Sequence, residues 1–290
     1  MEKWKYVVPI SILFVAFFLY IQSNWLQVSN YTVQSTKIPG SFTGFKILQL
    51  TDLHSKVFGK KNHKLIRKIN SIQPDIIVAT GDMLNSKNDN GMVFVELVKK
   101  LIQDYPIYYI VGNHEQINRL QERRAQSDEY DKYINQLKKL GVVILDNEKA
   151  VITKEEDQIN IYGLEIPLMY YSEIGTPIDV KFSYKYLERH LGPVEKEMFN
   201  LLLSHTPLYF PDYVDWGADL VFSGHMHGGI IRLPFVGGVL SPERDYFPEY
   251  DAGIYRVEDA TMVLGRGLGN FTINLRVFNR PELVVVTLNP

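Results

Sequence analysis

Histidine and acidic side chains recur along this chain beside glycines, where apolar stretches end. The clearest case is Gly224-His225-Met226-His227-Gly228-Gly229, which directly follows the apolar stretch 218–223. Neutral imidazole is the commonest metal ligand, and flanking glycines let a backbone turn sharply and approach a ligand closely. Side chains two residues apart in an extended segment point the same way, so we expect His225 and His227 to face one site. Alone, the pair is a weak signal, because a surface loop explains it equally well.

Matching side chains occur upstream, each just past an apolar stretch. The candidate metal ligands are Asp52, His54, Asp82, Asn113, His205, His225 and His227. All of them offer nitrogen or oxygen, and none is a thiolate. A mixed imidazole and carboxylate set suits zinc, iron or manganese better than calcium, which prefers oxygen alone.

Seven ligands exceed what one ion with an open coordination position could use. Two divalent ions that share a carboxylate would use them all, and ions about 3.5–4 Å apart are a known device for phosphoester hydrolysis. Such a pair stabilises the attacking and leaving oxygens, and it makes a bridging hydroxide available as the nucleophile near neutral pH. In an extended segment His114 faces away from Asn113, which leaves it free to give a proton to the leaving group.

The elements that must position these residues alternate between strand and helix. Strands are predicted at residues 45–51, 75–80, 107–111, 159–163, 200–204, 218–223, 261–264 and 283–288. Amphipathic helices are predicted at 60–72 and 92–103. The alternation predicts an α/β fold with strands parallel in part of a sheet, where ligands bind at the carboxyl ends of strands. No clear linker divides residues 45–290, which we predict to be one domain.

Composition narrows the class of protein. The chain has 290 residues, enough for one large domain or two ordinary ones, and 46% of them are hydrophobic. A net charge of −2 gives no support to a nucleic-acid partner, which usually requires a basic surface. Cysteine is absent, which excludes disulfides, thiolate ligands and a cysteine nucleophile.

The N-terminus has the features of a membrane segment. Residues 7–21 carry no charge, Lys3 and Lys5 precede them, and aromatic residues flank both ends. No small-x-small cleavage site follows, so we favour an uncleaved signal anchor over residues 1–26, with a cleaved signal peptide as the alternative. The positive-inside rule predicts a single-pass protein of the cell membrane whose catalytic domain lies on the extracytoplasmic side. Residues 27–44 are predicted to form a connector and a lead-in strand.

Taken together, the motifs resemble those of the calcineurin-like metallophosphoesterase family. They are Asp52-x-His54, Gly81-Asp82, Gly112-Asn113-His114-Glu115, His205 and Gly224-His225-Met226-His227, and they occur in the family's order over residues 45–230. The segments 265–269 and 276–282 are similar to a bacterial, often membrane-associated branch. The resemblance implies a four-layer α/β/β/α sandwich of two mixed sheets flanked by helices, here preceded by one transmembrane helix.

The resemblance also implies roles for the candidate residues. It assigns Asp52, His54 and His227 to a first ion. It assigns Asn113, His205 and His225 to a second ion, with Asp82 bridging both. His114 becomes the proton donor and phosphate contact. The ions are expected to be manganese, iron or zinc, and we favour manganese.

The implied activity is hydrolysis of a phosphodiester or pyrophosphate bond, which we favour over a simple monoester. Relatives in the wider family include UDP-diacylglucosamine pyrophosphatases, so a lipid-linked or UDP-sugar substrate is among those expected by analogy. The alternatives are a phosphomonoesterase or nucleotidase, and a non-catalytic scaffold of the same fold, as in a retromer subunit. All eight motif positions are filled, which favours the enzyme.

Other side chains near the motifs have two readings. One interpretation is that a second phosphate or an anionic headgroup binds to Arg119, Arg123 and Arg124. The favoured interpretation is that they form a solvated helix face balanced by acidic neighbours. Glu115 either orients His114 or simply flanks it. The aromatic, proline-containing stretches 166–171 and 235–247 fit contact with an apolar part of the substrate or with a membrane, and packing between the sheets explains them equally well.

Overall fold

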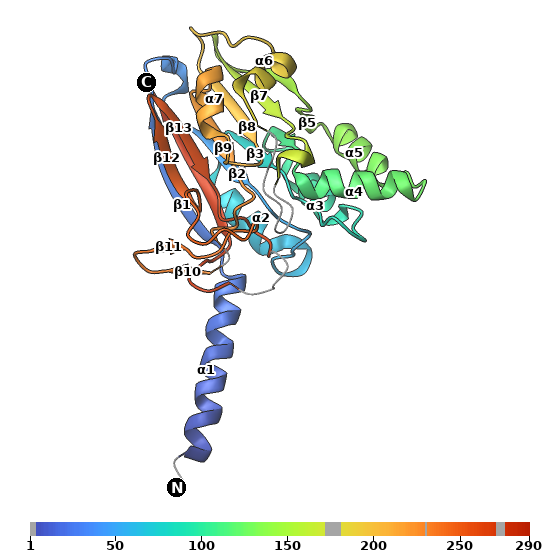
Figure 1. The fold of residues 1–290 in the computed structure, drawn as a ribbon, viewed down its shortest axis with the longest axis vertical. Helices are drawn as coiled ribbons and strands as arrows, with labels where there is room; N and C mark the ends of the chain where they lie inside the picture. Colours follow the sequence, from blue (N-terminus) through green and yellow to red (C-terminus); the bar gives the residue numbers. More distant parts are fainter. Residues whose placement is uncertain (1–3, 172–180, 230, 271–275) are drawn as a thin grey trace.

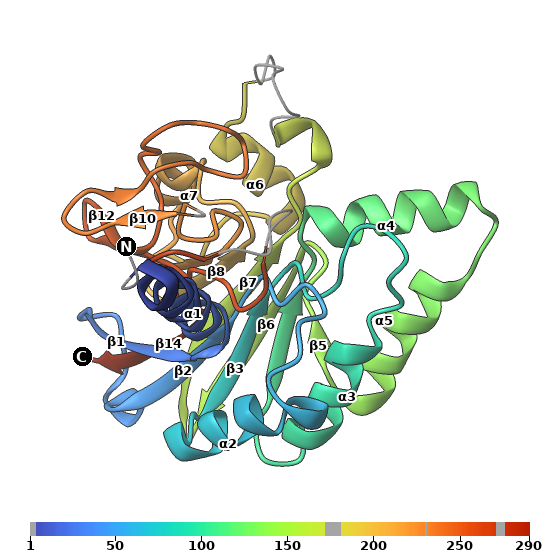
Figure 2. The same ribbon diagram turned by 90° about the horizontal axis from the view of Figure 1, so that it is seen from below.

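The computed structural model describes residues 1–290 except 1–3, 172–180, 230 and 271–275. Two six-stranded sheets pack face to face, and helices cover their outer faces, as the two views in Figure 1 and Figure 2 show. The predicted four-layer sandwich is therefore confirmed. One apolar core lies between the two sheets. Each sheet has one further core between its outer face and the helices that cover it.

The first sheet has the strand order β1-β14-β2-β3-β4-β5. Its strands are β1 (Gln27–Gln34), β2 (Phe45–Leu50), β3 (Ile76–Thr80), β4 (Ile107–Ile110), β5 (Val143–Ile144) and β14 (Glu282–Asn289). Strands β2 to β5 run parallel, β14 runs antiparallel to β2, and β1 runs parallel to β14. Every residue of β3 is buried, because this central strand is covered on both faces, as its unbroken apolar run predicts.

The second sheet has the order β12-β13-β9-β8-β7-β6 and is also mixed. Its strands are β6 (Glu148–Lys154), β7 (Asp157–Leu164), β8 (Asn200–Ser204), β9 (Leu220–Ser223), β12 (Gly253–Val257) and β13 (Ala260–Leu264). Strands β7, β8, β9 and β13 run parallel, and the two edge strands run antiparallel to their neighbours. A short hairpin, β10 (Arg232–Leu233) and β11 (Gly237–Gly238), stands apart from both sheets.

Helices α2, α3 and α5 contribute to the core on the first sheet, and α6 and α7 contribute to the core on the second. The helices are α1 (Trp4–Asn24), α2 (His63–Ile72), α3 (Met92–Leu101), α4 (Asn113–Arg124), α5 (Glu129–Leu140), α6 (Tyr184–Leu191) and α7 (Phe210–Trp216). Short 3-10 turns occur at η1 (Gly40–Phe42), η2 (Lys60–Asn62) and η3 (Leu168–Tyr170). The helices predicted at 60–72 and 92–103 are therefore α2, preceded by a 3-10 turn, and α3.

Helix α1 projects away from the sandwich (Figure 1). Within it, the 19 residues Tyr6–Asn24 are long and apolar enough to cross a membrane by length and composition. A membrane anchor and a signal sequence both have these properties. The predicted lead-in strand is β1, which begins at Gln27, after Trp25 and Leu26 that follow the helix.

The pairing of β1 with β14 predicts where the chain can be shortened. A chain that starts at Gln27 keeps every strand, whereas a chain that starts at Ser35 loses β1 and exposes the edge of β14. We expect the shorter chain to unfold at least about 5 °C below the longer one. Circular dichroism during heating measures this difference, and equal midpoints would show that β1 adds nothing to the sheet.

Candidate metal centre

The loops that follow strands of both sheets meet at one end of the sandwich. Backbone hydrogen bonds join them: the Asp52 N–H donates to the Gly81 oxygen, and the Gly224 N–H donates to the His205 oxygen. The loop after β13 joins the same end, because the Leu268 N–H donates to the Thr51 oxygen. Parallel strands therefore deliver their polar loop residues to one place, as the strand-end pattern predicts.

The histidines and aspartates at this end form three groups that could each hold an ion. The groups are Asp52, His54 and His227; Asp82, His205 and His225; and His54, Asp82 and His114. Within each group, one ligand atom per residue lies within 4.8 Å of the others. Six of the seven predicted metal ligands are thus brought together, and all six are buried.

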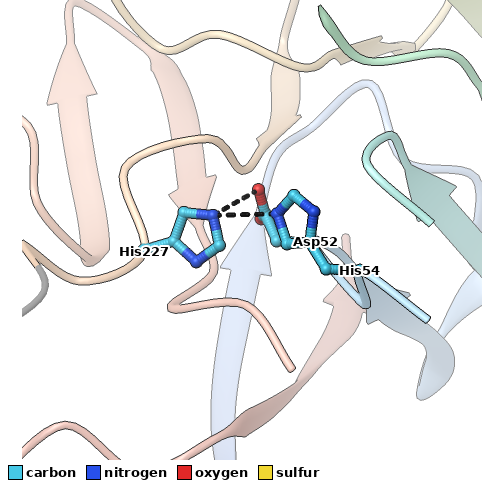
Figure 3. A group of neighbouring side chains, drawn as sticks. All are labelled: Asp52, His54 and His227. Atoms are coloured by element: carbon cyan, nitrogen blue, oxygen red, sulfur yellow. Dashed lines mark hydrogen bonds and ion pairs between the residues drawn. The ribbon is translucent and has the colours of Figure 1, made fainter. Parts of the chain in front are cut away.

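The first group places two imidazoles and a carboxylate around one point (Figure 3). The Nε2 atoms of His54 and His227 lie 3.1 Å apart, and Nε2 of His227 lies 3.5 Å from Oδ1 of Asp52. Burial lowers the pKa of His54 to about 3 and lowers the pKa of His227 well below its usual range. Both rings are therefore neutral, which is the form that binds a metal.

The second group is joined to the first through Asp82. Oδ2 of Asp82 lies 3.1 Å from Nε2 of His205 and 3.8 Å from Nε2 of His54, which places the carboxylate between the groups. Burial by itself would raise the pKa of Asp82, but neighbouring histidines, chiefly His205, hold it well below its usual range. Nδ1 of His205 lies 2.7 Å from the Thr80 oxygen, so Nε2 is the nitrogen that faces the site.

Asn113, the seventh predicted ligand, precedes His114, whose backbone N–H donates to Oδ1 of Asp82 at 2.9 Å. Oδ1 of Asn113 is buried and accepts no hydrogen bond from the described residues. A buried acceptor without a donor costs free energy unless something else satisfies it, and a cation would do so. The donor set as a whole, with imidazole nitrogens and carboxylate or amide oxygens, fits divalent transition metals.

The backbone at the site differs from our expectation for the histidine pair. His225 and His227 have φ angles of 71° and 51°, so the segment is a turn rather than extended, and the two side chains enter different groups. Asp52, His54 and Asp82 also have φ angles of 46° to 56°. Non-glycine residues rarely adopt this left-handed region, and such strain concentrates at functional sites.

The expectation of an extended segment at His114 is also wrong. Helix α4 begins at Asn113, so His114 lies in its first turn. Its side chain is half-buried, and the Ser86 N–H donates to Nδ1 at 3.1 Å. Because Nδ1 accepts a hydrogen bond, the hydrogen-bond pattern assigns the ring proton to Nε2.

Glu115 joins two of the loops and neither orients His114 directly nor simply flanks it. Its fully buried carboxylate accepts N–H groups from Asp82 at 2.8 Å, Met83 at 2.7 Å and Gly112 at 2.9 Å. Burial raises its pKa to about 7, although the backbone donors act in the opposite direction. A Cβ on Gly112 would collide with the Asp82 carboxylate, so only glycine fits between the joined loops.

Glu243 was not predicted and contacts the second group. Its Oε1 lies 3.1 Å from Nε2 of His225, and its side chain is 5% exposed. Metal-binding histidines usually donate their second ring N–H to a carboxylate or carbonyl, which fixes the orientation of the ring. Glu243 therefore leaves Nδ1 as the nitrogen of His225 that is available to an ion. It lies in a loop without periodic pattern, so no sequence signal marks it.

The three arginines predicted as possible phosphate contacts lie along α4. Arg119 is paired with Glu165, with Nη2 and Oε1 2.5 Å apart, and packs over the ring of Tyr130. Arg123 and Arg124 are exposed near the end of the helix. Arg119 is thus already engaged within the protein, and a role for these side chains toward substrate stays a prediction.

Comparisons with known proteins agree with this geometry. A family model described as calcineurin-like phosphoesterase matches residues 45–229. The chain is 29% identical over 276 residues to the uncharacterized metallophosphoesterase YkuE of Bacillus subtilis, covering 93% of this chain and 87% of that protein. It is 26% identical over 275 residues to phosphodiesterase YaeI of Escherichia coli, covering 93% and 90%. It is 24% identical to a Danio rerio protein named transmembrane protein with metallophosphoesterase domain, covering 90% and 57%.

The contacts of Glu115 predict a large effect of removing its carboxylate. In Glu115→Ala, four buried N–H groups lose this acceptor, and each such loss costs about 1–3 kcal/mol. We expect a clear fall in the thermal unfolding midpoint of the detergent-solubilised chain and a loss of bound manganese. Glu122→Ala on the same helix is the matched control. An unchanged midpoint in Glu115→Ala would contradict the role in joining the loops.

The contact between Glu243 and His225 predicts an effect on metal affinity. Removing a partner that orients a metal-binding histidine typically costs about 10–100-fold in affinity, and we expect this loss in Glu243→Gln. Calorimetric titration with Mn²⁺ measures it. Glu249→Gln, at an exposed position of the same loop, should bind Mn²⁺ like the unaltered chain. The same affinity in both variants would exclude the orienting role.

Proposed function

Because this chain belongs to the calcineurin-like phosphoesterase family, we propose that it hydrolyses a phosphodiester or pyrophosphate bond with two divalent ions. It is a metal-dependent phosphoesterase with buried aspartate and histidine groups suited to metal binding. One observation carries the proposal: the Asp82 carboxylate lies between two ligand groups, 3.1 Å from His205 in one and 3.8 Å from His54 in the other. Two ions that share a carboxylate require this arrangement.

The proposed ligands divide between the two groups. Asp52, His54 and His227 would hold one ion; Asn113, His205 and His225 would hold the other; and Asp82 would contact both. When bound, such ions polarise phosphoryl oxygens and lower the pKa of a water molecule. We favour manganese, and the donor set also accepts iron or zinc.

The protein's own residues fix these groups before substrate arrives. Thr51 Oγ1 donates to Oδ2 of Asp52 at 2.6 Å, and the His225 N–H donates to Oδ1 of the same carboxylate at 3.0 Å. Ligands held in this way are already in place where negative charge develops on the phosphoryl group. They do not have to reorganise during the reaction.

His114 is the proposed proton donor to the leaving group. Its ring lies beside His54, with centroids 4.5 Å apart, and the half-exposed side chain is accessible to a substrate. The Ser86 N–H holds Nδ1, so Nε2–H is the group that can reach the leaving oxygen. Its backbone N–H also supports Asp82, and this contact does not depend on the side chain.

The proposed substrate class follows from the relatives and from α1. YaeI is named a phosphodiesterase, which favours a diester over a monoester. The 19-residue apolar helix, and a relative named as a transmembrane protein, favour a membrane-anchored enzyme. We therefore propose a single-pass protein whose catalytic domain lies outside the cytoplasmic membrane, acting on a lipid-linked or similar phosphate. A phosphomonoesterase or nucleotidase would use the same site.

A change at His114 tests the mechanism. In His114→Ala we expect kcat on an alkyl phosphodiester to fall by about 10²–10⁴-fold, because a poor leaving group needs a proton. The loss on bis-p-nitrophenyl phosphate should be much smaller, since p-nitrophenolate leaves without one. Steady-state kinetics with Mn²⁺ and measured metal content distinguish these effects.

The exposed His63 on α2 provides the control, and His63→Ala should behave like the unaltered chain. Equal losses on both substrates in His114→Ala would contradict proton donation. No turnover of any phosphoester by the unaltered chain would instead favour a non-catalytic scaffold.

A further inference from the structure

The register of the first sheet places the metal centre at the end of the domain where α1 enters. Gln27, at the start of β1, pairs with Glu282 of β14, and Val284 of β14 pairs with Gln49 of β2. Continuing this antiparallel register by two residues places Glu282 beside Thr51. Neighbouring strands are about 4.8 Å apart, so Asp52 lies only about 10 Å across the sheet from the start of β1.

Direct contacts join the metal loop to the helix. Lys56, two residues after His54, donates from Nζ to the Ser23 oxygen in the last turn of α1 at 2.6 Å. Near the start of β1, Nη2 of Arg280 donates to Oε1 of Gln27 at 3.3 Å. The metal-binding end of the sandwich is therefore held against the end of α1, with no linker between them.

A second contact fixes how deep the domain lies. The ring of Phe278 packs edge-on against Phe18 of α1, with centroids 5.5 Å apart. Phe18 precedes Asn24 by six residues, or about 9 Å along the helix. The segment Tyr6–Asn24 spans about 28 Å, close to the roughly 30 Å hydrocarbon thickness of a bilayer. Because the apolar segment is only about as long as the hydrocarbon layer is thick, a membrane around α1 extends past Phe18. It therefore reaches the depth of Phe278, which packs against Phe18.

An exposed apolar surface surrounds this point. We call it the apolar rim, and it comprises Leu233, Phe235, Val236 and Phe278, which are exposed and line one cavity. Phe235 is fully exposed at the turn of the β10–β11 hairpin, so packing between the sheets does not explain it. Phe278 lines the same cavity as Phe235 and Val236, and the hairpin lies beside the end of α1 (Figure 1). Contiguous exposed apolar surface of this kind marks a contact with a protein or a membrane.

Positive charge lies beside the same end of α1. Lys64 and Lys68, one turn apart on α2, line a cavity of about 330 Å³ together with Tyr20 and Trp25. Aromatic rings are enriched at membrane interfaces, and lysines near the surface attract anionic headgroups. Charge and apolar surface thus flank the helix at the level where headgroups would meet it.

We infer that the apolar rim inserts into the bilayer that α1 crosses, and that this holds the metal centre at the level of the lipid headgroups. The substrate is then a phosphoester carried by a lipid of that bilayer. The inference rests on the proposed membrane anchoring and hydrolase activity. The occupant is the bilayer itself, because the contact at Phe278 continues directly from the membrane-crossing segment.

A depth measurement tests the insertion without any activity. The chain has no cysteine, so Phe235→Cys gives a single site for a nitroxide label in the full chain, reconstituted in vesicles of phosphatidylethanolamine and phosphatidylglycerol. We expect the label to be more accessible to oxygen than to a water-soluble nickel chelate. Leu120→Cys, exposed on α4, is the matched control and should show the opposite preference.

Two outcomes of this measurement would overturn the inference. In the first, the label at position 235 behaves like the label at 120, and the rim is in water. In the second, labels at 235 on different molecules broaden one another's spectra, and a second copy of the chain covers the rim.

An activity comparison tests the consequence for substrate. In the double variant Phe235→Asp, Val236→Asp, we expect kcat/KM on a phospholipid diester in the same vesicles to fall about tenfold or more, because two charges oppose insertion beside anionic lipid. On bis-p-nitrophenyl phosphate in solution it should be unchanged, as for Leu120→Asp on both substrates. Equal values on the lipid would overturn the inference. No turnover of any phosphoester by the unaltered chain would refute the proposed function, and the label measurement would still report on insertion.

Discussion

The buried carboxylate of Asp82 is the charge on which the rest of the site depends. It lies between the two ligand groups, its Oδ1 accepts the backbone N–H of His114, and its own N–H donates to Glu115. A buried carboxylate is stable only where cations or donors surround it, and the histidines around Asp82 hold its pKa well below the usual range. Both sheets supply these partners, so the site forms only when the sheets pack.

The loops that carry the ligands are held in conformations they would not adopt alone. Left-handed φ angles at Asp52, His54 and Asp82 cost free energy, although aspartate and histidine adopt this region more readily than most residues, and the inter-loop hydrogen bonds compensate for that cost. The carboxylate of Glu115 gathers the loops after β3 and β4, and Arg276, buried and bonded to the carbonyl oxygens of Gly267 and Asn279, orders the loop after β13. The surrounding fold therefore preorganises the ligands.

Local patterns predicted the alternation of strands and helices and the gathering of aspartates and histidines at strand ends, whereas the second sheet followed only from the family resemblance. Apolar runs such as 75–80 marked buried strands, and the polar residue after each run marked a strand end. The directions of His225 and His227 could not be predicted, because contacts with distant loops determine their backbone conformation. Glu115 lay within a predicted motif, but its acceptor role depends on N–H groups of the loop after β3.

The contacts of Glu243 and of the apolar rim could not be predicted from local sequence pattern. Glu243 reaches His225 from a loop without periodicity, and Phe278 contacts Phe18, which is far away in the sequence. Such contacts follow from the three-dimensional path of the chain rather than from residue spacing. The roles of the individual ligands and of the α4 arginines are still predictions.

The pairing of β1 with β14 also has a consequence for how the protein is made. β1 leaves the ribosome soon after α1, but its only described partner strand, β14, lies far downstream at Glu282–Asn289. Contacts so distant in sequence form late, since a long loop must close first. The first sheet therefore stays incomplete until β14 has been synthesised, and until then the unpaired backbone of β1 in the nascent chain is exposed to aggregation.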